Sequence, residues 1–168
     1  MLVKYIVAIT FREAPVLTQV QKGLAEEFGT MDVKSPAFVF DHTRYYEKEM
    51  GCNLSKQFVS FTQLFPREAL VSWKRKTMEI EARFSKNGRR QANIDPAYME
   101  LAKLVVASSK NFDHRIYLGD GVYGDVQLRF RGGRFVANEW TYPDYRSEVA
   151  LDFFHQVRTI YQTQLKHA

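Results

Sequence analysis

The segment DHRIYLGDGVYGDVQLRF, residues 113–130, decides the fold class of this chain. Two strand-like runs, HRIYL and VYGDVQLRF, flank the turn GDG, and glycines in such a turn supply the positive φ that tight hairpins require. A glycine pair at 132–133 then turns the chain into RFVANEW. Consecutive hairpins form an antiparallel meander, so the last third of the chain does not continue a strict alternation of strands and helices.

The N-terminal part of the chain has the order strand, helix, strand. Residues 2–9 are almost continuously apolar, which is typical of a strand buried on both faces. Pro15 begins a predicted helix that ends at Gly29, and AFVF at 37–40 is a second apolar strand. We therefore expect a β-α-β start.

The middle of the chain predicts one strand and two helices. KQFVSFTQL at 56–64 alternates as a strand does, and Pro66 begins a helix over 67–85. On that helix Lys74 and Glu81 lie seven residues apart, on a different face from the apolar stripe. Asp95 is a natural N-cap and Pro96 a natural first residue for a further helix that runs toward residue 112.

A fourth helix over 148–165 closes the chain. Several strands and four helices without late β-α alternation predict an α+β fold. We expect a single domain over residues 1–168, with a mixed sheet, the β-α-β start and the C-terminal antiparallel meander.

Composition is that of an ordinary globular protein: 168 residues, 45% hydrophobic and 26% charged, with a formal net charge of +5. The charge favours anionic partners only mildly. The single cysteine, Cys52, cannot form an internal disulfide, which fits a reducing compartment. No segment approaches the roughly 20 apolar residues of a membrane helix. We expect a cytoplasmic protein without a membrane partner.

The common catalytic motifs do not occur. The chain has no G-x-x-x-x-G-K-S/T phosphate loop, no G-x-G-x-x-G after a strand and no C-x-x-C. The four histidines lack the H-E-x-x-H spacing of zinc sites. The sequence therefore names no cofactor and predicts no metal site.

Polar groups are concentrated on the predicted hairpin. Alternation places four polar side chains on one face of the sheet: Arg115, Tyr117, Tyr123 and Asp125. It places four apolar ones on the other: Val122, Val126, Leu128 and Phe130. The polar face is suited to a polar ligand, but solvated antiparallel faces also carry such ion pairs, and both interpretations stay open. His114 is either structural or a proton carrier near neutral pH.

The segment WTYPDYR, residues 140–146, is aromatic and charged. Pro143 is incompatible with a regular central strand, so we expect an ordered loop. Its aromatic rings, beside Asp144 and Arg146, either cover the edge of the core or form the wall of a pocket.

Six ordered segments resemble one known family. They are FDHTRYYEKEMG (40–51), FVSF (58–61), NIDPAY (93–98), LAKLVVASSK (101–110), HRIYLGDGVY (114–123) and WTYPDYR (140–146). In this order, over nearly the whole chain, they resemble the bacterial domain of unknown function family 4416. The resemblance implies a set of site positions: Asp41, Tyr45, Glu47, Asp95, Lys110, His114, Arg115, Tyr117, Asp120, Asp125, Trp140, Tyr142 and Asp144.

Some members of that family carry a GTP-binding label. The residues of this chain do not support that label, because both the phosphate loop and the guanine-reading N-K-x-D motif are missing.

Our leading hypothesis is a pocket for a small polar or anionic metabolite, such as a nucleotide or another phosphorylated compound. Lys110 and Arg115 would contact the anion. His114 and Asp125 would be the catalytic proton carriers if a reaction follows, and Trp140 and Tyr142 the walls of the pocket.

Two alternatives stay open. The first is nucleic-acid (RNA) binding through KRK at 74–76, RR at 89–90 and the arginines 129, 131 and 134. The second is a protein-interaction module without a ligand.

Overall fold

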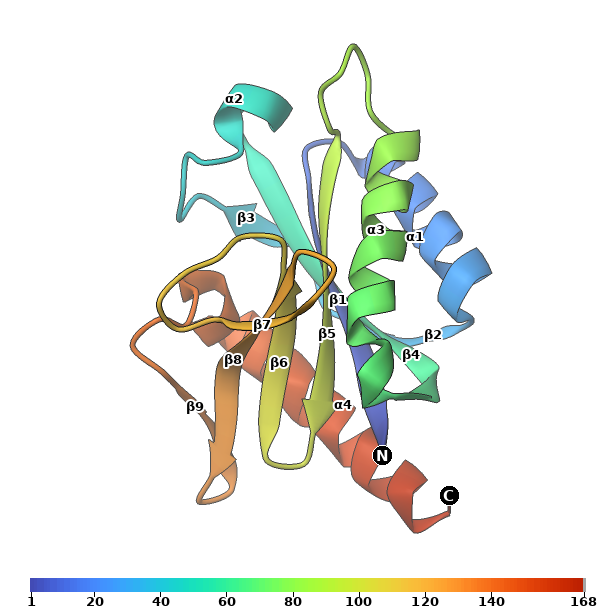
Figure 1. Cartoon of the computed structure of the whole chain (residues 1–168), viewed down its shortest axis with the longest axis vertical. Helices are drawn as coiled ribbons and strands as arrows, with labels where there is room; N and C mark the ends of the chain where they lie inside the picture. Colours follow the sequence, from blue (N-terminus) through green and yellow to red (C-terminus); the bar gives the residue numbers. More distant parts are fainter. Residues whose placement is uncertain (168) are drawn as a thin grey trace.

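Within residues 1–167, the part of the chain that the computed structural model describes, nine strands form one sheet (Figure 1). The strands are β1 (Leu2–Phe11), β2 (Met31–Lys34), β3 (Phe38–Phe40), β4 (Leu54–Pro66), β5 (Ala92–Glu100), β6 (Lys103–Ser108), β7 (Ile116–Gly119), β8 (Val122–Arg131) and β9 (Arg134–Ala137). The helices are α1 (Ala14–Phe28), α2 (Glu47–Met50), α3 (Leu70–Arg83) and α4 (Glu148–Lys166), with 3-10 turns η1 (Arg67–Ala69) and η2 (Pro143–Arg146).

The strand order is β2-β4-β1-β5-β6-β8-β7, with β3 also paired to β4 and β9 to β8. All these pairs are antiparallel. β1 and β2 run in the same direction with β4 inserted between them, and β1 likewise separates β4 from β5. This is the split β-α-β arrangement. The α+β class is confirmed, but the sheet is antiparallel rather than mixed, because the strands that run in parallel are never neighbours.

Helices cover both faces of the sheet. α1 and α3 pack on one face with Tyr5, Val7 and Ile9 of β1, whereas α4 packs on the other face with Ile6 and Ala8. Since each side chain of a strand points to the face opposite its neighbour's, a strand covered on both faces is mostly apolar, and the buried Lys4 of β1 is paired with Asp32. This explains the continuous apolar run at the N-terminus.

The predicted helix after Asp95 is wrong. The segment forms the strands β5 and β6, and Asp95 lies within β5 opposite Ala8 of β1, so it is not an N-cap. Lys110, predicted near the end of that helix, instead follows β6 in a loop. An Asp-Pro pair favours the start of a helix when only neighbouring residues are considered. In the folded chain the pairing of β5 with β1 outweighs this local preference. The short helix α2 brings the number of α-helices in residues 1–167 to four.

A bulge in β8 changes which residues share a face. Leu104 pairs with Leu128 but Val105 pairs with Val126, so Gln127 is an extra residue in β8. Val126 therefore packs on the side of α1 and α3, and Leu128 on the side of α4. The single apolar face predicted for the four residues is wrong, because one inserted residue reverses the alternation.

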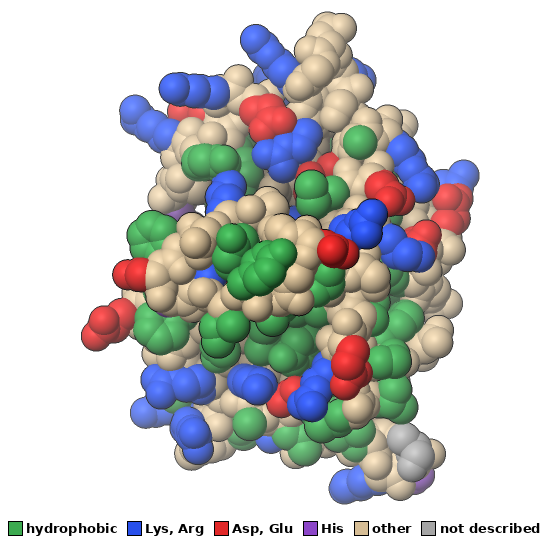
Figure 2. Space-filling model, in the orientation of Figure 1, with side chains coloured by type: hydrophobic (Ala, Val, Ile, Leu, Met, Phe, Trp, Pro, Cys, Tyr) green, Lys and Arg blue, Asp and Glu red, His purple; other side chains and the backbone are tan. Residues whose placement is uncertain are grey.

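The hairpin between β7 and β8 forms as predicted. Gly119 and Gly121 have φ values of 121° and 73°. β7 is the last strand in the order of the sheet, and its side chains Ile116, Tyr117 and Leu118 are exposed. Apolar side chains gather over this hairpin on the face of the molecule shown in Figure 2.

Candidate functional site

The sheet opens between β5 and β6. These strands are paired from Glu100 to Ala97, and beyond that point β5 stays with β1 while β6 stays with β8. The Ile94 N–H donates to Glu81 Oε1 (2.6 Å), and its carbonyl accepts from Lys74 Nζ (3.2 Å). The backbone of Pro96, two residues further along β5, faces the same side of the strand. Because proline has no backbone N–H, this position leaves no donor unpaired there. Side chains of α3 thus form the hydrogen bonds with the backbone of Ile94 that β6 would form if it stayed paired with β5.

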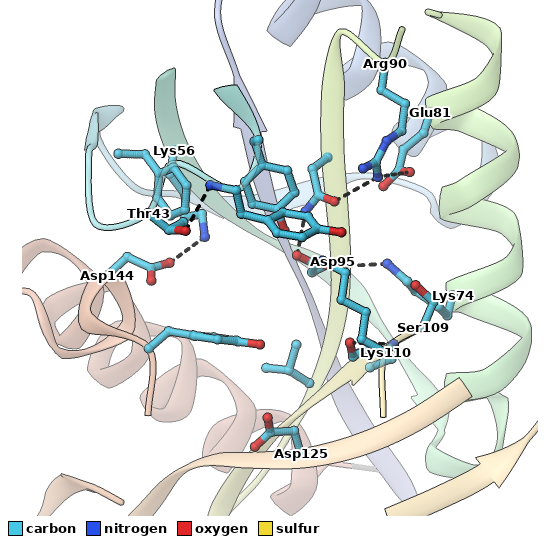
Figure 3. Close-up of a pocket in the computed structure, with 18 of the residues that line it drawn as sticks. Thr43, Lys56, Lys74, Glu81, Arg90, Asp95, Ser109, Lys110, Asp125 and Asp144 are labelled. Carbon is cyan, nitrogen blue, oxygen red and sulfur yellow. Dashed lines mark hydrogen bonds and ion pairs between the residues drawn. The ribbon is translucent and has the colours of Figure 1, made fainter. Parts of the chain in front are cut away.

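A cavity of about 670 Å³ lies at this opening. Its walls come from α3, β3, β4, β5, β6, β8, η2 and the segment that leads into α2 (Figure 3). The volume is in the usual range for small-molecule sites. Five aromatic side chains line it: Phe40, Tyr45, Tyr46, Tyr142 and Tyr145. Four cationic side chains and four carboxylates also line it: Lys56, Lys74, Arg90 and Lys110, with Glu81, Asp95, Asp125 and Asp144.

Lys74 and Asp95 form an ion pair of 2.9 Å between α3 and β5. Asn93 Nδ2 donates to the second oxygen of Asp95 (2.6 Å). Burial raises the pKa of Asp95, but the Lys74 ammonium and these hydrogen bonds outweigh that effect, so the pKa is lowered overall. Asp95 is therefore a fixed, ionised partner of Lys74 at neutral pH.

Lys56 and Asp144 form a second pair, between β4 and η2, at 2.5 Å. Their side chains are only 6% and 3% exposed. Lys56 Nζ also lies 4.3 Å from the centre of the Phe40 ring. This pair attaches the predicted aromatic loop, which is η2 in the structure, to the sheet.

Arg90 connects the start of β5 to α2 and α3. Its Nε and Nη2 donate to the two carboxylate oxygens of Glu49, each at 2.8 Å, and its Nη1 donates to Glu81 (3.2 Å). The hydrogen bond from Arg90 lowers the pKa of Glu49, whereas burial raises the pKa of Glu81. The bidentate contact holds α2 beside the cavity.

Lys110 differs from the other cations of the cavity. Its Nζ lies 3.4 Å from the centre of the Tyr45 ring and 5.5 Å from that of Tyr46. In residues 1–167 no carboxylate lies within 4.0 Å of this ammonium, whereas Lys56 and Lys74 each have one carboxylate partner and Arg90 has two.

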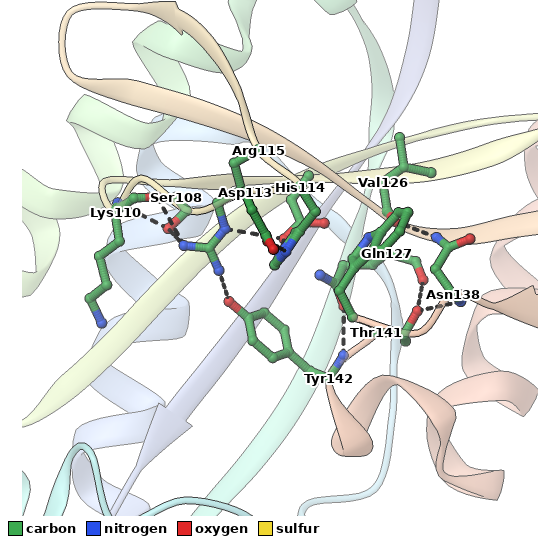
Figure 4. A network of polar contacts seen from close by, with 12 residues as sticks. Ser108, Lys110, Asp113, His114, Arg115, Val126, Gln127, Asn138, Thr141 and Tyr142 are labelled. Atoms are coloured by element: carbon green, nitrogen blue, oxygen red, sulfur yellow. Dashed lines mark hydrogen bonds and ion pairs between the residues drawn. The ribbon is translucent and has the colours of Figure 1, made fainter.

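Asp125, on β8, is 2% exposed, and its carboxylate is bound by two side chains that do not line the cavity. Its Oδ2 contacts His114 Nε2 and Arg115 Nε, both at 3.2 Å (Figure 4). The other imidazole nitrogen of His114 contacts Asp113 at 2.9 Å, and its ring stacks on Trp140 with centres 5.4 Å apart. Asp125 Oδ1 is buried and has no hydrogen-bond partner in the described part of the chain.

Arg115 is itself fixed by several acceptors. Its Nη1 donates to Ser108 Oγ (3.1 Å) and to the Lys110 carbonyl (2.9 Å), and its Nη2 donates to the Tyr142 hydroxyl. Burial raises the pKa of Tyr142, so that hydroxyl keeps its own proton. Arg115 therefore orients both Asp125 and Tyr142.

The predicted site residues fall into three groups. Six line the cavity: Tyr45, Asp95, Lys110, Asp125, Tyr142 and Asp144. Two stand behind Asp125 without lining the cavity: His114 and Arg115. Five lie outside the lining: Asp41, Glu47, Tyr117, Asp120 and Trp140.

The outlying residues have local partners. Asp120, in the hairpin turn, pairs with Arg75 at 3.5 Å, and both are more than 60% exposed. Tyr117 packs against Tyr123, and the Trp140 indole N–H donates to the Val126 carbonyl (3.0 Å). Asp41 is exposed beside His42, and Glu47 begins α2. The structure thus does not bring Tyr117 to Asp125, although the alternation of the hairpin placed them on one face.

Sequence reasoning missed the charged residues Lys56, Lys74, Glu81 and Arg90 of the cavity, together with polar residues such as Asn93. The separate face predicted for Lys74 and Glu81 is wrong, because both are buried on the same face of α3 as Leu70, Trp73 and Ile80. A polar residue between them, Thr77, was the available signal, since Lys74, Thr77 and Glu81 form a polar stripe next to Trp73 and Ile80.

The basic segments considered for nucleic acid are partly occupied by internal partners. Lys74 pairs with Asp95, Lys76 with Glu27, and Arg90 with two glutamates. Arg129, Arg131 and Arg134 are exposed.

Two further findings concern residues 1–167. No group of three or more histidine, cysteine, aspartate or glutamate side chains is arranged to hold a metal ion. None of the described helices combines the length and the apolar character needed to cross a membrane.

Fold and site together define an α+β protein in which an antiparallel sheet with a split β-α-β start opens onto a charged, aromatic cavity. The chain belongs to the family described as Domain of unknown function (DUF4416), whose sequence model matches residues 1–161. This confirms the resemblance found from the sequence motifs. Comparison with the curated proteins and with the solved structures gives no significant match.

Proposed function

We propose that this protein binds a small anionic metabolite, a phosphorylated compound, in the cavity between β5 and β6, and that it does so in the cytoplasm. The observation that carries the proposal is the Lys110 ammonium, which faces the cavity without a carboxylate partner in residues 1–167. An ammonium held against tyrosine rings is ready to exchange that contact for an ion pair with a phosphate.

The arrangement of charges supports an anion at Lys110 in particular. The cationic and acidic side chains of the lining are equal in number. The selection of a ligand must therefore depend on where each charged group lies and not on the net charge of the cavity. Lys56, Lys74 and Arg90 are committed to carboxylates at 2.5–3.2 Å. Buried ion pairs are a weak source of stability, and a filled apolar core would serve the fold equally well. Charges retained around an open cavity are therefore better explained by binding.

The aromatic lining supports a ligand with a planar or apolar part. Tyr45 and Tyr46 lie on one side, before α2, and Tyr142 and Tyr145 lie at η2. Binding pockets commonly combine such rings with a few polar groups that fix orientation.

The test is a binding screen at low ionic strength, read by protein NMR and by calorimetry. The probes are inorganic phosphate, ribose 5-phosphate and nucleoside monophosphates, each compared with its uncharged counterpart where one exists. We expect the phosphorylated probes to bind and the Lys110→Met variant to bind them at least about tenfold more weakly, as for loss of one charge-assisted contact.

Lys22→Met is the matched control, because Lys22 is exposed on α1 and does not line the cavity. It should leave binding unchanged. Equal binding by the Lys110→Met variant and the unmodified protein, or no binding of any phosphorylated probe, would overturn the proposal.

A further inference from the structure

One oxygen of the cavity has no partner. Asp125 Oδ1 is buried, and the side chain to which it belongs lines the cavity (Figure 3). Buried acceptors are normally hydrogen-bonded, because an unmade bond leaves the cost of removing the group from water uncompensated. A donor supplied by a ligand would remove this cost.

The direction of this oxygen is fixed. Oδ2 of the same carboxylate is held by His114 and Arg115, and Arg115 is held in turn by Ser108 and the Lys110 carbonyl. Arg115 also supplies one positive charge against the one negative charge of Asp125. Because that charge is already balanced, an uncharged N–H donor suits Oδ1 better than a second cation.

A hydrogen-bond donor accompanies this acceptor. Arg115 donates to Asp125 through Nε and to Tyr142 through Nη2, and these two nitrogens form one edge of the planar guanidinium (Figure 4). The carboxylate and the phenol are therefore neighbours. Since the Tyr142 oxygen accepts from Arg115, its own O–H is available to donate.

We infer that Asp125 and Tyr142 together recognise an amide-like edge of the ligand, an N–H beside a C=O, of the kind that lactam rings such as uracil and hypoxanthine present. The N–H donates to Asp125 Oδ1 and the C=O accepts from the Tyr142 hydroxyl. The inference rests on the proposed function and specifies its ligand class: phosphorylated compounds that carry a lactam, with the phosphate at Lys110.

The test uses pairs of probes that differ by one methyl group. Uridine 5′-monophosphate is compared with 3-methyluridine 5′-monophosphate, and inosine 5′-monophosphate with its 1-methyl derivative, by calorimetry or NMR titration. We expect methylation to weaken binding about tenfold or more, because it removes the N–H and leaves Oδ1 unpaired. In Asp125→Asn the two members of a pair should bind within about threefold of each other.

Two further variants separate the roles. Tyr142→Phe should weaken binding of the unmethylated nucleotide and keep the discrimination against the methyl group. Asp120→Asn, on the same hairpin but exposed, should change neither. If Asp125→Asn does not fold, the methyl pairs on the unmodified protein decide the question alone.

The outcomes distinguish the two proposals. Equal binding of methylated and unmethylated nucleotides, or ribose 5-phosphate bound as tightly as uridine 5′-monophosphate, would overturn the lactam inference and leave phosphate binding intact. Uridine and 3-methyluridine, tested without phosphate at higher concentration, examine the Asp125 contact independently of Lys110. Failure of both nucleosides and all phosphorylated probes to bind would overturn both proposals.

Discussion

Lys74 lines one wall of the cavity and Arg115 lies behind another, and each forms an ion pair with an aspartate that lines the cavity. On the α3 wall, Asp95 accepts from Lys74 through one oxygen and from Asn93 through the other. On the β8 wall, Arg115 and His114 share one oxygen of Asp125, and the second oxygen has no partner. The first wall is closed in its hydrogen bonding and the second is open toward the cavity.

The difference separates charges that maintain the opening in the sheet from charges that are free to meet a ligand. Lys74 and Glu81 satisfy the backbone of Ile94, which β6 no longer pairs. Without them, an exposed strand edge would line the cavity with unpaired groups. Substitutions on the α3 wall should therefore act on stability, and substitutions on the β8 wall mainly on binding.

The largest effect is expected for Lys74→Met, on the α3 wall. It leaves Asp95 without its ion partner and Ile94 without a donor, and should lower the free energy of unfolding by about 3 kcal/mol. Urea unfolding monitored by circular dichroism measures this change, with Lys22→Met as the exposed control.

The double variant Lys74→Met with Asp95→Asn sharpens the test. Because it removes both charges, it should recover part of the loss. A loss below about 1 kcal/mol for Lys74→Met alone would show that the charges of the α3 wall contribute little to the stability of the fold.

The pH dependence of stability gives a second test of the closed wall. The pKa of Asp95 is lowered in the folded protein, so its ionised form stabilises the fold above the ordinary aspartate pKa of about 4. This contribution is lost as the pH falls through the lowered pKa. The difference in unfolding free energy between the unmodified protein and Asp95→Asn should be constant from pH 7 to 5 and shrink below about pH 4.

Glu81 titrates with the opposite sign. Burial raises its pKa, so its contribution to stability decreases as the pH rises, but it is present in both proteins and largely cancels in their difference. Urea titrations at pH 7, 5, 4 and 3 measure the difference. An increase of the difference toward low pH would contradict the assigned direction for Asp95.

The smallest effect on stability is expected for Tyr142→Phe, on the open wall. It removes one hydroxyl that accepts from Arg115, a loss of about 1 kcal/mol, or roughly 2–4 °C in melting temperature. Tyr123→Phe, on the neighbouring hairpin, is the control. A loss as large as that for Lys74→Met would remove the distinction between the two walls.

Local sequence signals were sufficient where one short segment defines its own structure. The apolar run of β1 predicts burial on both faces, and the glycines around Asp120 predict the hairpin. These signals failed at Asp95 and Pro96. The same two residues suit the start of a helix and also a strand segment that has a neighbour on only one side, as β5 has here. Only the pairing with β1 distinguishes these, and that pairing joins residues about 90 positions apart in the chain.

The candidate site followed the same division. Asp125 and Tyr142 stood out because polar and aromatic residues crowd short segments of the chain, whereas Lys110 became a candidate through the family resemblance. Lys56 is a single cation in a strand, and Lys74 and Arg90 belong to basic runs that suggested nucleic acid instead. Only packing brings these three side chains to the cavity. Trp140, predicted as a wall of the pocket, instead stacks on His114 and does not line the cavity.

By itself the sequence determined the α+β class, the turns and the residues with chemistry to offer, because hydrophobic period and turn geometry are set by near neighbours. The tertiary structure alone decided which of those residues meet. An inserted Gln127 reverses the alternation along β8, and the separation of β6 from β5 makes the cavity. Both depend on hydrogen bonds between strands distant in the chain, which no local pattern encodes.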